Sequence, residues 1–175
     1  MTRAREIANL GTSFSGTANN VSLGEGVLGS LTSGTNNVAI GEDALAANTT
    51  ASNNTAVGYQ AGTANTTGQQ NVAIGYQSLY SNTTADFNTA LGWQALYSNT
   101  TGTFNVGISP YSLHNTTTGS SNIAIGYQAI ENNTTGSNNV AVGYKAHEGS
   151  GATTASNNIA IGYEALKGIT IGTQN

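Results

Sequence analysis

The chain has 175 residues, which suits a single domain, and only 7% of them are charged, against about 25% in an ordinary soluble domain. The net charge of −4, without any basic cluster, argues against nucleic acid as a partner, because phosphate binding needs a stripe of Lys and Arg. With no cysteine, the fold has neither disulfides nor thiolate metal sites. No apolar run approaches the roughly 18 residues of a membrane span, so we expect no membrane insertion.

The segment 1–18 precedes the regular part of the chain, and we expect it to cap or dock the fold. Ile7 and Leu10 have helical spacing, which predicts a short helix over residues 2–10. The first ten residues lack the apolar middle of a secretory signal, so ordinary export is not expected.

An internal repeat fills residues 19–167, and the segment 168–175 breaks its period as a C-terminal tail or cap. A landmark residue, glycine in every repeat but one, recurs after 17 residues seven times and then once after 19. So short and constant a period predicts a solenoid, in which each repeat is one coil and neighbouring coils stack. The landmarks are Gly24, Gly41, Gly58, Gly75, Gly92, Ser109, Gly126, Gly143 and Gly162.

Each coil carries a short apolar alternation just before its landmark. A Val, Ile or Thr stands three residues before it, a small residue two before, and a Leu, Ile or Val directly before. Alternation with period two predicts a short strand that ends in a bend. We expect residues such as Ile74 to be buried, and the small face of Ala73 and Gly75 to meet another backbone.

An asparagine stands four residues before every landmark, where the strand begins. Identical amides in register can bond along a stack, so we predict a buried structural ladder. Its members are Asn20, Asn37, Asn54, Asn71, Asn88, Asn105, Asn122, Asn139 and Asn158.

In six of the nine coils the second half begins with an aromatic residue, and an Asn-Thr-Thr turn usually ends it. A Leu or Ile between them is expected to point inward. We interpret the aromatic row as a packed stack and also as the candidate surface-binding row. It comprises Tyr59, Tyr76, Trp93, Tyr127, Tyr144 and Tyr163.

The apolar content of one coil is small. Ordering each residue costs roughly 1–2 kcal/mol, and a handful of buried Val, Ile and Leu at about 1.5–3 kcal/mol each offsets this poorly. We therefore expect a homotrimer of parallel copies around a threefold axis. The rival is a monomer whose small face packs against the opposite side of its own coil.

The unit N-[VIT]-A-[IVL]-G-x-x-[AS] resembles the head repeat of trimeric autotransporter adhesins, and NNTAVGYQA…NTTG resembles repeats in the tail fibres of marine bacteriophages. The resemblance covers about residues 19–166. It implies an all-β, left-handed parallel β-roll of about nine coils, trimeric fibres and attachment to host surfaces, with no catalytic residues. The opening eleven residues also look like a segment common in phage fibre proteins. Lacking a stalk and an anchor barrel, the chain fits the phage hypothesis better.

No residue pattern predicts catalysis, a metal site or a cofactor. His114 and His147 differ in their place within the coil, and we expect both to be solvated loop residues. The two extra residues near 147–151 are expected to form a surface loop, where solenoids often bind.

We therefore predict a structural virion protein of a phage tail, not an enzyme, which assembles with other virion or fibre proteins and attaches weakly and multivalently to host-surface glycans. The alternatives are a bacterial, extracellular adhesin head, a spacer without binding, and an ice-binding solenoid suggested by the threonine rows. A depolymerase is more distant, since it needs a larger carboxylate-lined groove.

Overall fold

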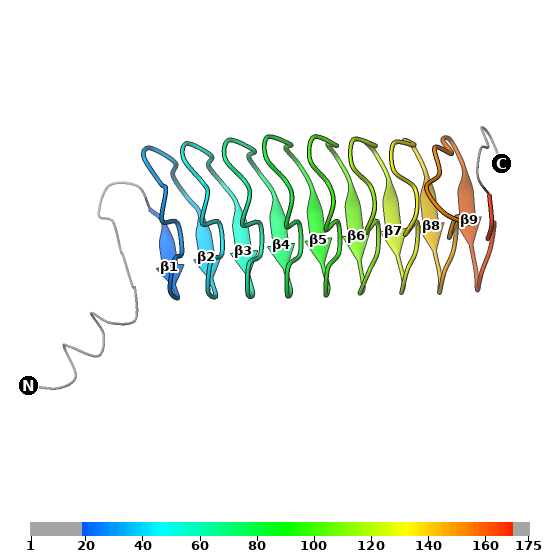
Figure 1. The fold of residues 1–175 in the computed structure, drawn as a ribbon, viewed down its shortest axis with the longest axis horizontal. Helices are drawn as coiled ribbons and strands as arrows, with labels where there is room; N and C mark the ends of the chain where they lie inside the picture. Colours follow the sequence, from blue (N-terminus) through cyan, green and yellow to red (C-terminus); the bar gives the residue numbers. More distant parts are fainter. Residues whose placement is uncertain (1–18, 170–175) are drawn as a thin grey trace, which may run out of the picture.

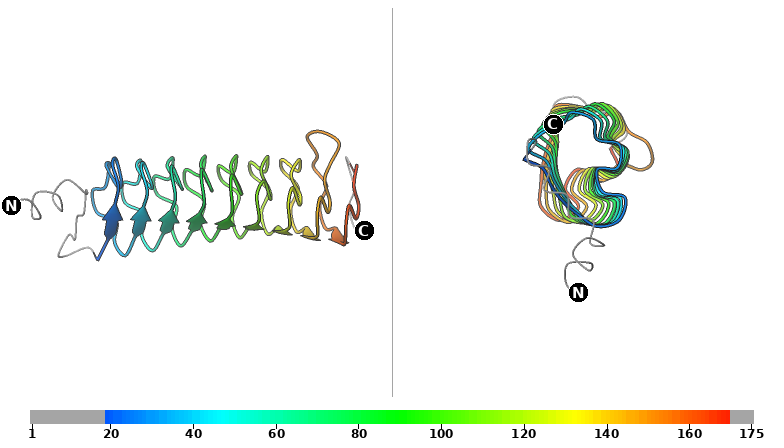
Figure 2. Two further views of the ribbon diagram at one scale, coloured as in Figure 1. Left: turned by 90° about the horizontal axis from the view of Figure 1, so that it is seen from below. Right: turned by 90° about the vertical axis from the view of Figure 1, so that its left-hand side faces the viewer.

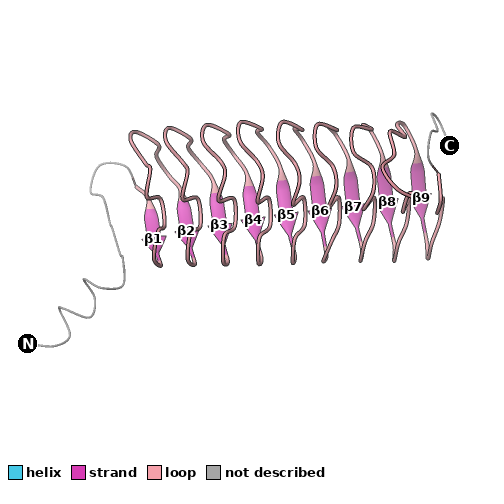
Figure 3. Ribbon diagram, in the orientation of Figure 1, coloured by secondary structure: helices cyan, strands magenta, loops and turns pink. Residues whose placement is uncertain are grey.

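The computed structural model describes residues 19–169; the helix expected over 2–10 and residues 170–175 lie outside that part. Within it, nine strands of three residues stand in single file (Figures 1 and 3). They are β1 (Val21–Leu23), β2 (Val38–Ile40), β3 (Thr55–Val57), β4 (Val72–Ile74), β5 (Thr89–Leu91), β6 (Val106–Ile108), β7 (Ile123–Ile125), β8 (Val140–Val142) and β9 (Ile159–Ile161).

The strands form one parallel sheet in sequence order, β1 to β9. Each strand residue pairs with its repeat equivalent, as Val72 does with Thr89, and the pairing Val140↔Ile159 absorbs the two extra residues. Viewed along its axis, the chain winds as superposed turns with only the late loop projecting (Figure 2). The predicted all-β solenoid is confirmed, and its handedness and trimeric state remain predictions. We number the coils one to nine after their strands.

The two faces of the sheet are the reverse of what we expected. In every strand the middle, small residue is buried, and the residues on either side of it point outward. Ala73 is 2% exposed, whereas Leu91 directly before its landmark is 42% exposed. The expectation that the residue before the glycine is buried was therefore wrong for the single chain, and the small face lines the coil's own interior.

The narrowness of the coil explains this orientation. Large apolar residues of the turn, among them Leu79, Leu96 and Leu113, point inward as predicted and are fully buried. They occupy the space in front of the sheet, so only a small residue fits opposite them. At Gly107 even a methyl group would lie 3.0 Å from the Ser112 hydroxyl and 3.5 Å from Leu96. The second half of the coil is a turn.

The chain bends at all nine landmarks, as predicted, and each has a positive φ. Coils also approach closely here: a Cβ on Gly75 would lie 2.6 Å from the carbonyl oxygen of Gly92. Ser109 adopts φ 109° and is the one side chain that the row accommodates.

The predicted asparagine ladder is present and buried, although its main bond differs from the one expected. The backbone N–H of each asparagine donates to the Oδ1 of the asparagine one coil earlier, at 2.7–3.1 Å. The Nδ2 group then donates to a turn carbonyl, as Asn71 does to Ala85 at 2.8 Å. Amide-to-amide bonds occur in part of the ladder, for example from Asn139 to Asn122 at 3.0 Å.

A second buried asparagine row, which we had taken for ordinary turn residues, meets the ladder at the same turn carbonyls: Asn54 and Asn65 both donate to Gly68 at 2.9 Å. Asn48 accepts the backbone N–H of Ala51, and Asn82 donates to Asn65 one coil away at 2.9 Å. Two amide rows thus satisfy the backbone of the turn that leads into each strand. The row comprises Asn48, Asn65, Asn82, Asn99, Thr116 and Asn133.

Candidate assembly face and surface ladders

The outer face of the sheet is an apolar strip two side chains wide, which we call the apolar strip. Its rows are the first and third residues of all nine strands, and Thr55 and Thr89 are its only polar members. These side chains are half-buried or exposed because nothing among residues 19–169 covers them. The rows are Val21, Val38, Thr55, Val72, Thr89, Val106, Ile123, Val140 and Ile159, then Leu23, Ile40, Val57, Ile74, Leu91, Ile108, Ile125, Val142 and Ile161.

The strip is large for an uncovered surface. Nine strands spaced about 4.8 Å apart make it roughly 40 Å long and about 10 Å wide, or on the order of 400 Å². The largest apolar patch on a monomeric protein is of that order and often marks an interaction site. Here the patch is flat, continuous and free of charged residues, which suits a second β-face.

The aromatic row follows the bend of the coil, beside the strip. Tyr59, Tyr76 and Trp93 stack with centroids 5.4 and 4.2 Å apart, and Pro110 takes the next place in the row. The stack resumes as Tyr127, Tyr144 and Tyr163, with centroids 5.5 and 5.3 Å apart. The predicted row therefore forms two separate three-ring stacks.

Stacking limits what these rings can bind. Because adjacent rings lie within 19° of parallel, each inner ring turns its faces to its neighbours. A sugar can stack only on an open face at the end of a row, while ring edges and hydroxyls remain available along it. At Tyr59, burial and the Glu42 carboxylate raise the pKa of the phenol, which keeps it neutral and able to donate a hydrogen bond.

The residue after the aromatic adds an amide ladder. Gln77 donates to Gln60 and Gln94 donates to Gln77, each at 2.9 Å. These side chains are half-buried, so the ladder stiffens the bend and leaves part of each amide in water.

Two further stacks were missed by the sequence analysis. Tyr80, Tyr97 and His114 stack at 5.0 and 5.1 Å, so His114 is half-buried against a ring instead of free in a loop. Phe87 and Phe104 stack at 4.9 Å while 44% and 56% exposed.

The phenylalanine pair lies at a strained place in the coil. Both residues have positive φ, at 61° and 59°, in a row where other coils carry residues such as Asn53, Asn138 or Ser121. That backbone costs a bulky residue roughly 1–2 kcal/mol. The break in the Asn/Gln/Ser row was the signal in the sequence that could have drawn attention to this pair.

The two threonine rows have different roles. In the first, the hydroxyl donates to a carbonyl of the next coil, as Thr66 does to Thr83 at 2.9 Å, so this row stabilises stacking. The second row is exposed along one edge of the solenoid: Thr50, Thr67, Thr84, Thr101, Thr118, Thr135 and Thr154. The ice-binding alternative depends on two parallel threonine rows, as a flat Thr-x-Thr strand presents them. This solenoid exposes one such row, which does not favour that alternative.

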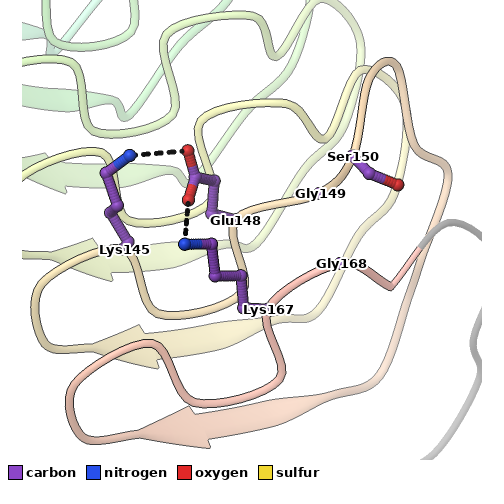
Figure 4. A pocket seen from close by; sticks show the side chains of 6 residues that line it. All are labelled: Lys145, Glu148, Gly149, Ser150, Lys167 and Gly168. Atoms are coloured by element: carbon purple, nitrogen blue, oxygen red, sulfur yellow. Dashed lines mark hydrogen bonds and ion pairs between the residues drawn. The ribbon is translucent and has the colours of Figure 1, made fainter.

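The extra residues of coil eight form the projecting loop, and Ser150, Gly151 and Ala152 are exposed as expected. At its base lies a cavity of about 230 Å³ lined by Lys145, Glu148, Gly149, Ser150, Lys167 and Gly168 (Figure 4). Glu148 lies between the two lysines, 3.1 Å from Lys145 and 3.7 Å from Lys167. Hydrogen bonds to Glu148 and Glu164 raise the pKa values of Lys145 and Lys167 respectively, so both ammonium groups stay charged.

His147, which we expected in solvent, is 3% exposed; this expectation was wrong. It takes the inward place that leucine or isoleucine holds in most coils. Among residues 19–169 no group of three or more His, Cys, Asp and Glu side chains could hold a metal ion. In the same part of the chain, no helix has the length and apolar character needed to span a membrane.

Fold and surface together define a parallel β-solenoid repeat protein with one uncovered apolar strip and several stacked polar and aromatic rows. Searches against protein-family models, curated proteins and solved structures find no match to this chain.

Proposed function

We propose that the chain is a fibre segment in which three parallel copies pack their apolar strips against one another around the fibre axis. The apolar strip carries this proposal, because it runs the whole length of the sheet and no other part of the described chain covers it. An axis parallel to the solenoid sets each coil beside the same coil of its partners, so all nine coils contribute contacts. The number three comes from the resemblance to trimeric adhesin heads and phage fibres.

Size and hydrophobicity support self-assembly over a small ligand. A strip of about 400 Å² per copy offers three copies a continuous interior, and burying each Val, Ile or Leu contributes about 1.5–3 kcal/mol. Thr55 and Thr89 would meet their own equivalents near the axis, where their hydroxyls can bond to one another.

The test is the oligomeric mass of the protein and of a strip variant. Ile74→Lys with Ile108→Lys places charges from every copy near one axis, so we expect a folded monomer with an unchanged far-ultraviolet circular dichroism spectrum. The matched control is Thr84→Lys, which adds the same charge on an exposed turn and should leave the trimer intact. A stable monomer of the unmodified protein by light scattering would contradict the proposal.

At the level of the organism, the proposal is a virion component of a phage tail that contributes rigid extension and weak, multivalent attachment to a host surface. A stacked solenoid is stiff, and repeated faces let weak contacts add through effective concentration. Neutral hydroxyls, amides and ring edges recur once per coil on this surface, a chemistry that suits glycans. The resemblance to phage fibre repeats supports the location, with a bacterial adhesin head as the alternative.

Mass spectrometry of purified virions tests the location, and binding of the purified protein to host cells tests attachment. We expect to detect the protein in virions, and cell binding that weakens when it is made monomeric by the lysine variants. Absence from virions would refute the location, whereas presence without cell binding would leave only the role of a spacer.

A further inference from the structure

His147 differs from the other inward residues of its row. The same place in the coil holds Leu79, Leu96 and Leu113, with Ile130 one coil before it and Leu166 one coil after. All of these positions have positive φ, at 51–55°, so the backbone does not demand histidine in coil eight. Its side chain therefore replaces a leucine in the interior.

The imidazole is buried without polar contacts. Among residues 19–169, neither Nδ1 nor Nε2 of His147 has a hydrogen-bond partner, although the residue is 3% exposed. Only its backbone is engaged, by an N–H donated to Ala165 at 2.7 Å. Native proteins satisfy most buried polar atoms, so an exception of this kind calls for an explanation.

The charged groups near His147 lie on the surface of coils seven to nine. Glu131 follows Ile130 in coil seven, Lys145 and Glu148 flank His147 in coil eight, and Glu164 and Lys167 belong to coil nine. The last four form a chain of ion pairs. Figure 4 shows the two that Glu148 makes, with Lys145 and with Lys167. None contributes to the lowered pKa of His147, which results from burial alone. Within residues 19–169 none of these side chains forms a hydrogen bond or ion pair with the His147 ring.

His147 also lies beside the last coil that the structure describes. Coil nine is stacked on one side only within the described residues, and its Ile159 and Ile161 are 63% and 69% exposed. An end coil loses one set of neighbour contacts when it detaches, whereas an inner coil loses two. The projecting loop connects coil eight to coil nine (Figure 2).

We propose that His147 makes the packing of coil nine on coil eight pH-dependent. Protonation of its ring releases coil nine, residues 158–169, from coil eight and leaves the first seven coils intact. With coil nine displaced, the imidazolium reaches water. The closed state at neutral pH keeps the ring neutral and the last coil stacked.

The direction of the pH dependence follows from the lowered pKa of the closed state. Above about pH 6.5 the ring is neutral in both states, and the closed coil has its full stability. Between that value and the lower pKa of the closed state, only the open state binds the proton, so falling pH favours opening. Below the lower pKa both states are protonated, and the loss levels off.

Hydrogen-exchange protection of the coil-nine amides, corrected for the intrinsic rate at each pH, measures this opening. We expect protection over 159–168 to fall by about tenfold for each pH unit below 6.5, until the lower pKa is reached. Amides of β4 to β6 should change little. His147→Leu restores the residue of the neighbouring coils, and it should increase protection and make it independent of pH between 7.5 and 5.

Two control variants separate His147 from the other titratable groups. His114→Gln and Glu148→Gln should both keep the pH response of the unmodified protein. A flat profile in the unmodified protein overturns the proposal, as does an unchanged response in His147→Leu. If that variant folds poorly, the NMR titration of the His147 ring in the unmodified protein decides instead. A titration midpoint at or above pH 6.5 would refute the pH-dependent release of coil nine.

Discussion

At the scale of single residues, glycine is required at the bend for two separate reasons. Gly75 has a φ of 130°, which L side chains rarely adopt, and its missing side chain lets the Gly92 backbone approach. The last landmark, Gly162, has a similar φ of 124° but no atom within 4 Å of an added Cβ among the described residues. The two positions therefore share the strain and differ in the contact.

Substituting these two glycines should separate the two causes. We expect Gly75→Ala to lower the free energy of unfolding by about 3–5 kcal/mol, because strain of about 1–3 kcal/mol adds to the shift of a neighbouring coil. Gly162→Ala should cost only the strain. Chemical denaturation of both variants measures the difference, and equal losses would mean that close stacking is not what selects glycine.

At the scale of the element, the asparagine ladder replaces the hydrogen bonds that a three-residue strand is too short to supply. Each ladder amide accepts a backbone N–H from the next coil and donates to a turn carbonyl, so it joins strand and turn in one bond network. This need explains why the asparagine recurs in every coil.

Asn71→Ala tests the ladder. The change leaves the backbone N–H of Asn88 buried without its partner, whereas the carbonyl of Ala85 keeps the hydrogen bond from Asn82 at 3.1 Å, so we expect a loss of about 1–3 kcal/mol. Asn138→Gly is the control, since Asn138 is exposed and its φ of 61° suits glycine. It should change stability by less than about 1 kcal/mol, and thermal unfolding compares the two. A small loss for Asn71→Ala would show that water replaces the amide.

At the scale of the whole molecule, the reversal of the two sheet faces divides the roles of neighbouring residues. Ala73 belongs to the interior of one chain, whereas Ile74 beside it lies on the strip that we assign to assembly. Changes at one position should therefore affect folding, and changes at the other should affect association.

Ala73→Trp should accordingly disrupt the coil itself, because Ala73 is buried in the narrow interior, which has no room for an indole. We expect a loss of cooperative unfolding and of β-sheet signal in circular dichroism at every protein concentration. Tyr76→Trp is the matched control, since the same row already accepts Trp93 on the outer surface. A folded, merely dissociated Ala73→Trp protein would instead place the small face between subunits.

The sequence alone determined the solenoid, its period, the bend at each landmark, the buried asparagines and the inward leucines. These features depend on local requirements, such as a positive φ at Gly75 or a repeated amide at Asn71, which recur visibly along the chain. Only the tertiary structure decided which strand face points inward, because an alternation of period two marks two faces without identifying the inner one. That choice depends on the width of the coil, which Leu79 and its equivalents set from the opposite wall. The burial of His147 depends on the same packing. The repeat register places His147 in the leucine row, but only the tertiary structure shows that its ring stays buried despite the inserted loop that follows it.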